Sequence, residues 1–225
     1  MPFQNEKNIL FSKHHIGGRS GSTAFPTVKK LHKSMAITSY EADVNCLPQI
    51  EQMQQNMGYD KIEIIGKYIG SSDSSIKFNL NYDPYTSSVL QVNQKYLNFY
   101  NESGDFDYDF KSTMKTVKTI ELPVVSLDSV EKLYPIDFLS LDAQGSELEI
   151  LKGATNSLQN VVGIETEISF IEMYKDTPLF GDICSFLNKQ GFDFICFTNV
   201  FGSAPLTMPY FGRARKNHSF GEAFF

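Results

Sequence analysis

Acidic and amide side chains follow a short apolar run in the second half of the chain. The stretch FLSLDAQGSELEILKGA, residues 138–154, begins like a buried strand and ends like a helix, with Asp142 and Gln144 at the junction. A carboxylate in this position contributes little to packing, but it is well placed to hold a ligand or to take a proton. Gln144 offers both a donor and an acceptor to a substrate. These two residues are therefore candidates for a site.

Other polar features also lie where predicted strands end. The turn HIGGRSG, residues 15–21, follows the first strand, and Glu41 ends the second. Glu167 lies near the carboxyl end of a later strand, so its side chain is a further candidate. A glycine turn or an acid at a strand end is, taken alone, at least as often purely structural. Because ligands bind at the carboxyl edge of parallel sheets, these features together predict one site.

Strand and helix patterns alternate along the whole chain. This predicts a single α/β domain over residues 1–225, with a mostly parallel seven-stranded sheet and helices on both faces. The last two strands follow each other without a helix, which predicts an antiparallel pair at one edge. The predicted strands are 8–16, 36–43, 61–70, 138–141, 161–168, 192–201 and 219–225, with extended pieces at 74–80 and 117–125. The predicted helices are 23–33, 48–58, 147–153 and 179–190, with another beginning near 126–128.

Composition limits the partners that the protein is expected to have. The chain has 225 residues, 41% of them hydrophobic, and a net charge of −6. An acidic protein is not expected to bind nucleic acid through its phosphates. The three cysteines are scattered and lack metal-ligand spacing, which predicts reduced thiols and no metal site. The sequence has no apolar leader and no membrane-length run, which predicts a cytoplasmic protein without a membrane partner. The sequence does not predict an oligomeric state.

The glycine turn indicates the class of cofactor. Dinucleotide-binding loops have the spacing G-x-G-x-x-G, which is missing here, so a nicotinamide-dependent oxidoreductase is disfavoured. S-adenosylmethionine methyltransferases have the pattern acid-x-G-x-G-x-G instead. Gly17 and Gly21 keep that spacing, while His15 and Arg19 replace the acid and the middle glycine. Glu41 ends the next strand, where a carboxylate accepts hydrogen bonds from ribose hydroxyls.

Five stretches in order give the chain a family resemblance. The chain resembles the FkbM family of S-adenosylmethionine-dependent methyltransferases over nearly its whole length. The stretches that carry the resemblance are FLSLDAQGSELEILKGA, VVGIETEISFIEMYKDTPLFGDICSFLNKQGFDF, SSVLQVN, VSLDSV and the terminal EAFF. The resemblance implies a Rossmann-like class I methyltransferase fold and methyl transfer to an oxygen of a small molecule or a glycan. The implied cofactor-binding residues are His15, Gly17, Gly18, Arg19, Gly21, Glu41, Ala42, Ile69 and Asp142. The implied catalytic residues are Asp142, Gln144 and Glu167.

Two questions about individual residues stay open at this stage. Asp142 can act as the base for an acceptor hydroxyl or bind the amino group of the cofactor. His15 stands where the family usually has Asp, and a protonated His would repel a cationic cofactor. Affinity is then expected to fall as the pH drops through the titration of His15. The replacement of Asp by His15 also motivates a competing hypothesis, in which the protein has this fold and binds the cofactor but is catalytically degenerate.

The region 81–115 is unusually rich in aromatic residues. Tyr82, Tyr85, Tyr96 and Tyr100 are among them, together with several phenylalanines. Long segments of this kind act as lids or binding loops, and aromatic hydroxyls suit a sugar or polyketide acceptor. The alternative is that half of these side chains simply pack a helix near 89–100 onto the sheet.

Overall fold

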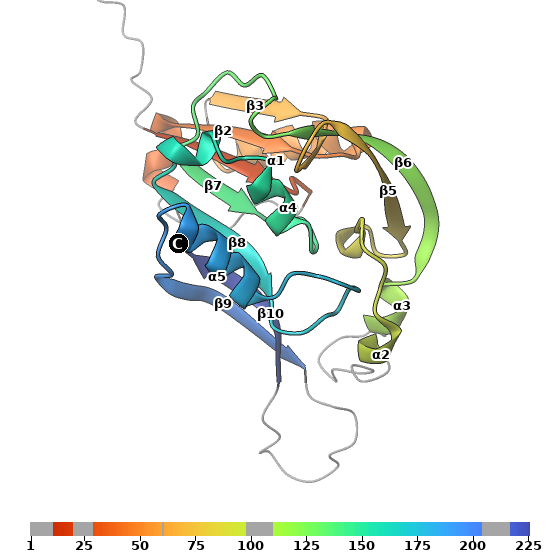
Figure 1. The fold of residues 1–225 in the computed structure, drawn as a ribbon. Helices are drawn as coiled ribbons and strands as arrows, with labels where there is room; N and C mark the ends of the chain where they lie inside the picture. The colour runs from red at the N-terminus through yellow and green to blue at the C-terminus, as the bar shows by residue number, and fades with distance from the viewer. Residues whose placement is uncertain (1–10, 20–28, 60, 98–109, 204–216) are drawn as a thin grey trace, which may run out of the picture.

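A seven-stranded sheet forms the centre of the computed structural model, which describes residues 11–19, 29–59, 61–97, 110–203 and 217–225 (Figure 1). Its strand order is β3-β2-β1-β7-β8-β10-β9, and only β10 runs antiparallel to its neighbours. The strands are β1 (Phe11–Ile16), β2 (Met35–Tyr40), β3 (Lys61–Ile65), β7 (Phe138–Leu141), β8 (Gly163–Ser169), β9 (Cys196–Ser203) and β10 (Asn217–Phe224). The predicted Rossmann-like α/β fold with an antiparallel edge pair is confirmed.

Helices cover both faces of this sheet. On one face, α1 (Leu47–Asn56) contacts β2 through a hydrogen bond from Gln54 Nε2 to Ser39 Oγ. On the other, α4 (Glu147–Lys152) and α5 (Phe180–Lys189) share one apolar core with β7 and β8. The short helices are η1 (Lys29–Ser34), η2 (Val44–Cys46), η3 (Pro84–Thr86), α2 (Gln94–Leu97), α3 (Phe110–Thr113) and η4 (Ser157–Asn160). Most of the helix predicted at 23–33 lies outside the described residues.

Side chains alternate between the two faces of the central strands, and the apolar ones face α4 and α5. Leu139 and Leu141 of β7 pack there beside Ile164 and Ile168 of β8. The intervening Ser140 and Glu165 point to the opposite face, as the period of two in a strand requires. Both polar residues are nonetheless buried, which makes this second face of the central sheet unusually polar.

The strand predicted at 61–70 is in fact two strands in two sheets. It divides at Gly66, where a Cβ would lie 3.0 Å from Leu47 Cδ1, so the chain turns closely over the start of α1. After this turn, β4 (Tyr68–Gly70) joins a three-stranded sheet with β5 (Ser74–Asn81) and β6 (Thr116–Ser126), in the order β4-β6-β5. This smaller sheet contains both extended pieces that the sequence predicted outside the central strands.

The helix predicted to begin near 126–128 is absent from the structure, where a turn follows β6. Asp128, at the predicted helix start, instead accepts hydrogen bonds from the backbone amides of Asn156 and Ser157, at 2.9 and 2.8 Å. The carboxylate therefore caps the start of η4, a segment distant in sequence.

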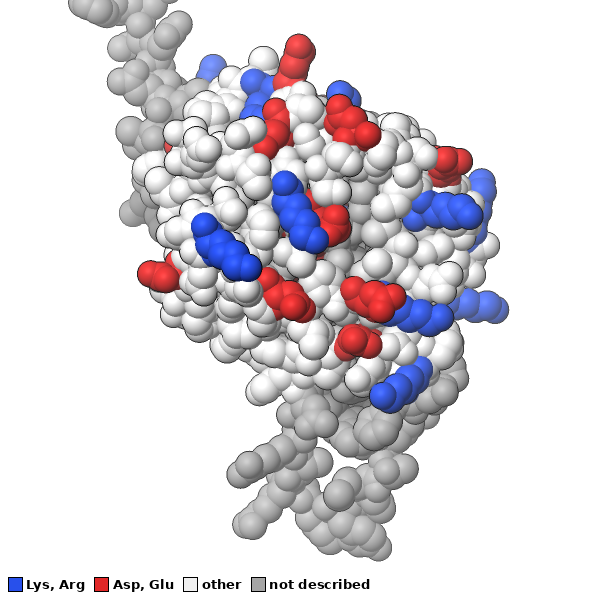
Figure 2. Space-filling view, viewed as in Figure 1, with Lys and Arg blue, Asp and Glu red and all other residues white. Residues whose placement is uncertain are grey.

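The described surface mixes both signs of charge. Figure 2 shows Lys and Arg interspersed with Asp and Glu over one face of the molecule, without a broad area of a single sign. That face therefore lacks the continuous basic surface by which proteins hold nucleic-acid phosphates. Among the described residues, no helix has the length and apolar character needed to cross a membrane.

The two sheets meet where α4 ends. A Cβ on Gly153 would lie 2.1 Å from the carbonyl oxygen of Gly70 and 3.0 Å from Ser71 Cα. Gly153 also accepts a hydrogen bond through its carbonyl from the amide of Asp128, at 3.0 Å. Only glycine allows the end of α4 to approach the backbone of β4 this closely.

We predict that Gly153→Ala lowers the free energy of unfolding by about 1–3 kcal/mol, because backbone must move to admit the methyl group. Gly181→Ala is the matched control, since a Cβ at this α5 position meets nothing within 4 Å. That variant should be neutral or more stable by about 0.5–1 kcal/mol. Urea unfolding measures both, and equal stabilities would show that the contact between the sheets can relax freely.

Candidate functional site

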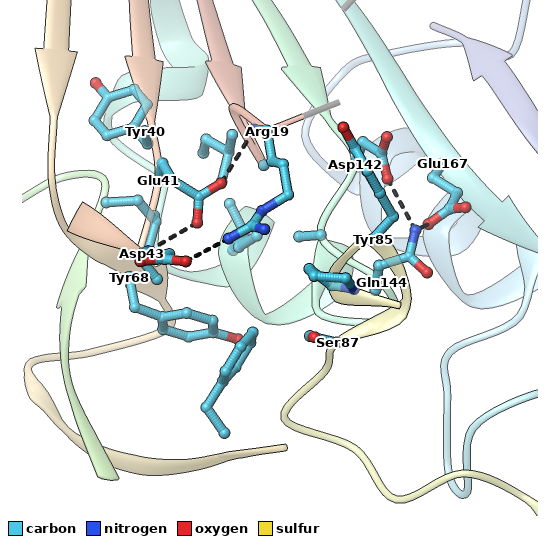
Figure 3. A pocket seen from close by; sticks show the side chains of 18 of the residues that line it. Arg19, Tyr40, Glu41, Asp43, Tyr68, Tyr85, Ser87, Asp142, Gln144 and Glu167 are labelled. Atoms are coloured by element: carbon cyan, nitrogen blue, oxygen red, sulfur yellow. Dashed lines mark hydrogen bonds and ion pairs between the residues drawn. The ribbon is translucent and has the colours of Figure 1, made fainter. Parts of the chain in front are cut away.

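A cavity of about 330 Å³ lies at the carboxyl edge of the central sheet (Figure 3). Most of the residues predicted from the sequence line it, and the small sheet and η3 form its outer wall. The predicted residues on its lining are Gly17, Arg19, Glu41, Ala42, Ile69, Asp142, Gln144 and Glu167. Gly21 lies outside the described residues. His15 and Gly18 are described, but they are not on the lining.

The glycine turn is tied tightly to the strands beside it. Gly17 has a φ of 94°, and a Cβ there would lie 1.8 Å from the carbonyl oxygen of Asp142. The amide of Asp142 donates to the Ile16 carbonyl at 3.0 Å, which holds the ends of β1 and β7 together. The amides of Gly17 and Gly18 both donate to the Tyr40 carbonyl at the end of β2. These contacts require glycine at position 17 and fix the turn against the site.

Gly18 supports the turn without facing the cavity. A Cβ on this residue would lie 3.2 Å from Ile50 Cδ1 of α1 and 3.3 Å from the Tyr40 carbonyl oxygen. It therefore allows the turn to pack closely on α1. The expected direct contact between Gly18 and a cofactor stays a prediction.

His15 is likewise turned away from the cavity, which corrects the expectation that it replaces a cofactor-binding acid. It is the penultimate residue of β1, and its side chain is 1% exposed. Its Nε2 contacts the Gly17 carbonyl oxygen at 3.1 Å, so this nitrogen carries the proton, and its Nδ1 accepts from Ser140 Oγ at 3.1 Å. Burial, with a smaller contribution from Lys13, lowers the His15 pKa to about 3. His15 is thus neutral and supports the glycine turn through its hydrogen bond to the Gly17 carbonyl.

Glu41 is held in place directly after β2. Its Oε2 accepts from the amide of Arg19 at 3.1 Å, and its Oε1 accepts from the amide of Asp43 at 2.8 Å. Each carboxylate oxygen retains a further lone pair for a ligand. Ala42 and the buried Ile69 add apolar surface to the same cavity. A fixed carboxylate beside apolar surface fits the hydroxyls and the base of a nucleoside.

Gln144 joins two carboxylates at the other end of the cavity. Its Nε2 donates to Asp142 Oδ1 at 3.0 Å and to Glu167 Oε2 at 3.1 Å (Figure 3). These two carboxylates fix the orientation of the amide, whose Oε1 lies 3.1 Å from the Tyr174 hydroxyl. The same hydroxyl also lies 2.7 Å from the Thr86 carbonyl oxygen. Ser88 Oγ donates to the Gln144 carbonyl at 2.6 Å. With a φ of 52°, Gln144 also has a backbone conformation that is uncommon outside glycine and found more often at functional sites.

The carboxylates in this region are poorly solvated. Burial, together with the charges of Asp142 and Glu147, raises the Glu167 pKa well above its usual range. Glu222 lies opposite Glu167 in the β8–β10 register, and burial raises its pKa as well. Glu147, which accepts from the amides of Ala143 and Gly145, has a pKa raised by burial to about 7. This end of the cavity therefore favours a proton or a cation.

Several site residues were not predicted from the sequence. Glu222 comes from the terminal strand, and Tyr174 from a loop; their position at the site depends on pairing between distant segments. Tyr85, in the aromatic region, lines the cavity, whereas Leu97 and Met114 pack with Tyr174 in a separate small core. The aromatic region thus contributes both to the wall of the cavity and to this separate small core. Its residues 98–109 lie outside the described part of the chain.

Comparison with known proteins gives a family match over most of the chain. Residues 14–194 match the family described as the methyltransferase FkbM domain. A search of curated proteins gave no match. A precorrin-6y C5,15-methyltransferase from Geobacter metallireducens GS-15 aligns with a TM-score of 0.41 and 12% identity, over 95% of this chain and 80% of that one. A putative methyltransferase from Bacillus halodurans C-125 aligns with a TM-score of 0.44 and 5% identity, over 95% and 89%.

The burial of His15 predicts a pH effect on stability. Below pH 6.5 the unfolded chain binds a proton at His15 that the folded protein, with a pKa of about 3, does not bind. Stability from this group is therefore present above pH 6.5 and is lost as the pH falls. Relative to His15→Gln, the wild type should lose about 2 kcal/mol of unfolding free energy between pH 7 and pH 5.

Urea unfolding at the two pH values measures this difference. His218→Gln, at an exposed position on β10, is the control and should follow the wild type. Parallel pH profiles for the wild type and His15→Gln would mean that His15 is hydrated or charged in the folded protein.

Proposed function

Because the chain belongs to the FkbM methyltransferase domain family, we propose that it transfers a methyl group from S-adenosylmethionine to an oxygen of a small molecule or a glycan. The observation that carries this proposal is the division of one cavity into two ends. One end has the fixed carboxylate of Glu41, and the other has Asp142 and Glu167 joined by Gln144. The first end suits a nucleoside, and the second suits the groups that react.

The lining residues fit the separate parts of such a cofactor. Glu41 accepts hydrogen bonds from the ribose hydroxyls, while Ala42 and Ile69 contact the adenine. Asp142, whose backbone is bonded to the glycine turn, binds the amino group. When bound, the cofactor supplies an activated methyl group on a cationic sulfur. The poorly solvated carboxylates at this end of the cavity would favour a ligand that carries positive charge.

Glu167 and Gln144 act on the acceptor. Gln144 orients the acceptor hydroxyl, and Glu167 takes its proton as the oxygen–carbon bond forms. The bound cofactor would supply the methyl group and would leave as a neutral thioether, so the transfer needs no further co-reactant. Burial raises the pKa of Glu167, and a carboxylate with a raised pKa binds a proton more strongly than an ordinary one, which supports its role as the acceptor of this proton. The proton then passes from Glu167 to solvent.

The competing hypotheses lose support from the same residues. The degenerate-module hypothesis was motivated by His15, and its side chain lies behind the turn rather than in the cavity. The glycine turn lacks the spacing of a dinucleotide loop, which disfavours an oxidoreductase.

All three cysteines are free thiols, in keeping with a reducing, cytoplasmic setting for the proposed enzyme.

Glu41→Ala should weaken the binding of S-adenosylhomocysteine by roughly 1.5–3 kcal/mol, since charge-assisted hydrogen bonds to the ribose are lost. Isothermal titration calorimetry measures the change. Glu121→Ala, which removes an exposed carboxylate from β6, is the control and should bind like the wild type. Unchanged affinity in the Glu41 variant would remove this residue from the site.

Asp142→Asn and Glu167→Gln separate cofactor binding from proton transfer. We expect Asp142→Asn to weaken S-adenosylhomocysteine binding by about tenfold or more. Glu167→Gln should keep that affinity and lower turnover by about 10²–10⁴-fold. Turnover is followed as S-adenosylhomocysteine release, with an acceptor found by screening pooled sugars and hydroxylated small molecules. Normal turnover in the Glu167 variant would contradict its role as the base.

A further inference from the structure

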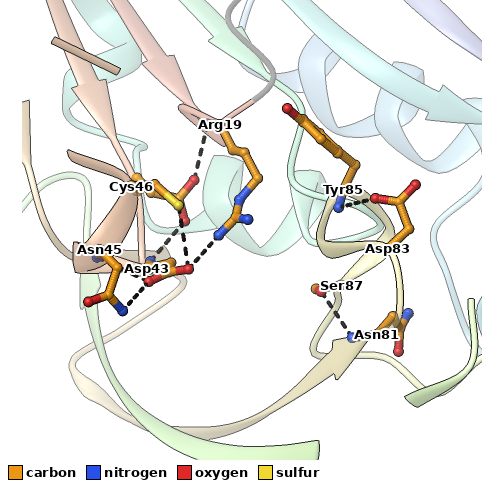
Figure 4. A network of polar contacts seen from close by, with 9 residues as sticks. Arg19, Asp43, Asn45, Cys46, Asn81, Asp83, Tyr85 and Ser87 are labelled. Atoms are coloured by element: carbon orange, nitrogen blue, oxygen red, sulfur yellow. Dashed lines mark hydrogen bonds and ion pairs between the residues drawn. The ribbon is translucent and has the colours of Figure 1, made fainter. Parts of the chain in front are cut away.

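The side chain of Arg19 extends into the cavity from the position of the middle glycine in the turn. Its guanidinium forms an ion pair with Asp43, and the two side chains are 24% and 34% exposed (Figure 4). Its backbone amide donates to Glu41, so the base of this side chain is fixed. A cationic side chain thus starts from the turn itself and lies within the proposed cofactor cavity.

The ion pair can be exchanged at little cost. Asp43 has partners besides Arg19, because its Oδ1 accepts from the amide and the side-chain nitrogen of Asn45, at 3.1 and 2.9 Å. Cys46 Sγ also lies 3.5 Å from Asp43 Oδ2. Partly exposed ion pairs contribute only about 0–1 kcal/mol. A competing carboxylate can therefore replace Asp43 as the partner of Arg19 without leaving Asp43 unsatisfied.

The backbone of the turn offers little else to an anion. The amides of Gly17 and Gly18 donate to the Tyr40 carbonyl, and the amide of Arg19 donates to Glu41. Among the described lining residues, Arg19 and Lys67 are the only cations. The carboxylates on the lining are Glu41, Asp43, Asp142, Glu167 and Glu222. A ligand that carries its own carboxylate needs a cation to enter such a cavity.

We infer that Arg19 exchanges Asp43 for the α-carboxylate of the cofactor and so selects nucleosides that carry a complete amino-acid group. This inference rests on the proposed function, because it takes an adenosine-linked amino acid as the ligand. A guanidinium matches a carboxylate through two parallel hydrogen bonds, which an ammonium cannot reproduce. Asp142 then remains available for the amino group. Arg19 acts as a specificity-determining residue and has no part in proton transfer.

The test compares two ligands that differ only in the carboxylate. These are S-adenosylhomocysteine and its decarboxylated analogue, which keeps the amino group. In calorimetry we expect Arg19→Met to weaken S-adenosylhomocysteine binding by about tenfold or more. The same variant should bind the decarboxylated analogue within about twofold of the wild type, because no charge-assisted pair is lost. Lys67→Met, which removes the other lining cation, should affect neither ligand.

A second variant tests the exchange itself. Asp43→Asn removes the competing anion and should strengthen S-adenosylhomocysteine binding by about two- to fivefold, with no gain for the analogue. Thermal unfolding checks that each variant is folded. An equal loss for both ligands in Arg19→Met, or a selective loss in Lys67→Met alone, would overturn the role of Arg19 and leave the proposed function standing. Failure of both ligands to bind the wild type would overturn the proposed function itself.

Discussion

The close approach of Gly17 to the Asp142 carbonyl is the constraint on which the site depends. It brings the end of β1 against the end of β7, with no room for a side chain between them. The turn can then bend toward β2, where the Tyr40 carbonyl takes two of its amides. Glu41 and Asp142, which directly follow the strands on either side of β1, consequently face one cavity. A larger residue at position 17 would separate the two ends of the site.

The polar residues of the site depend on one another for their orientation. Gln144 is the central member, because its amide nitrogen meets two carboxylates and its amide oxygen meets Tyr174. A glutamate in its place would put a third negative charge between Asp142 and Glu167. The carboxylates are kept close together in a poorly solvated space, and that arrangement is unfavourable unless a proton or a cation is shared among them. The electrostatics of the protein are thus suited to a positively charged ligand.

Local pattern was sufficient to predict much of this architecture. The strand and helix around Asp142, the position of Glu41 and the antiparallel edge pair all follow from short-range periodicity. The errors have physical causes. His15 belongs to a strand whose alternation turns it away from the site, although its position in the motif suggested a ligand contact. Gly66 interrupts the run KIEIIGKYIG, but a single glycine does not show that the chain leaves the sheet there, because that depends on packing against α1. Tyr174 and Glu222 reach the site only through long-range pairing.

The three-stranded sheet has a consequence for how the protein can diversify. The residues proposed to hold the cofactor lie mainly at the strand ends of the central sheet, whereas Phe78, Leu80 and Tyr85 come from β5 and η3. Gln144 and Glu167, which are proposed to act on the acceptor, also lie at the central sheet, so only the part of the wall from β5 and η3 is encoded in a separate stretch of sequence. Under the proposed function, substitutions at Phe78, Leu80 and Tyr85 would change the shape of the cavity without altering Glu41 or Asp142. The shape of this wall and the polar chemistry of the strand ends are thus determined by different segments of the chain.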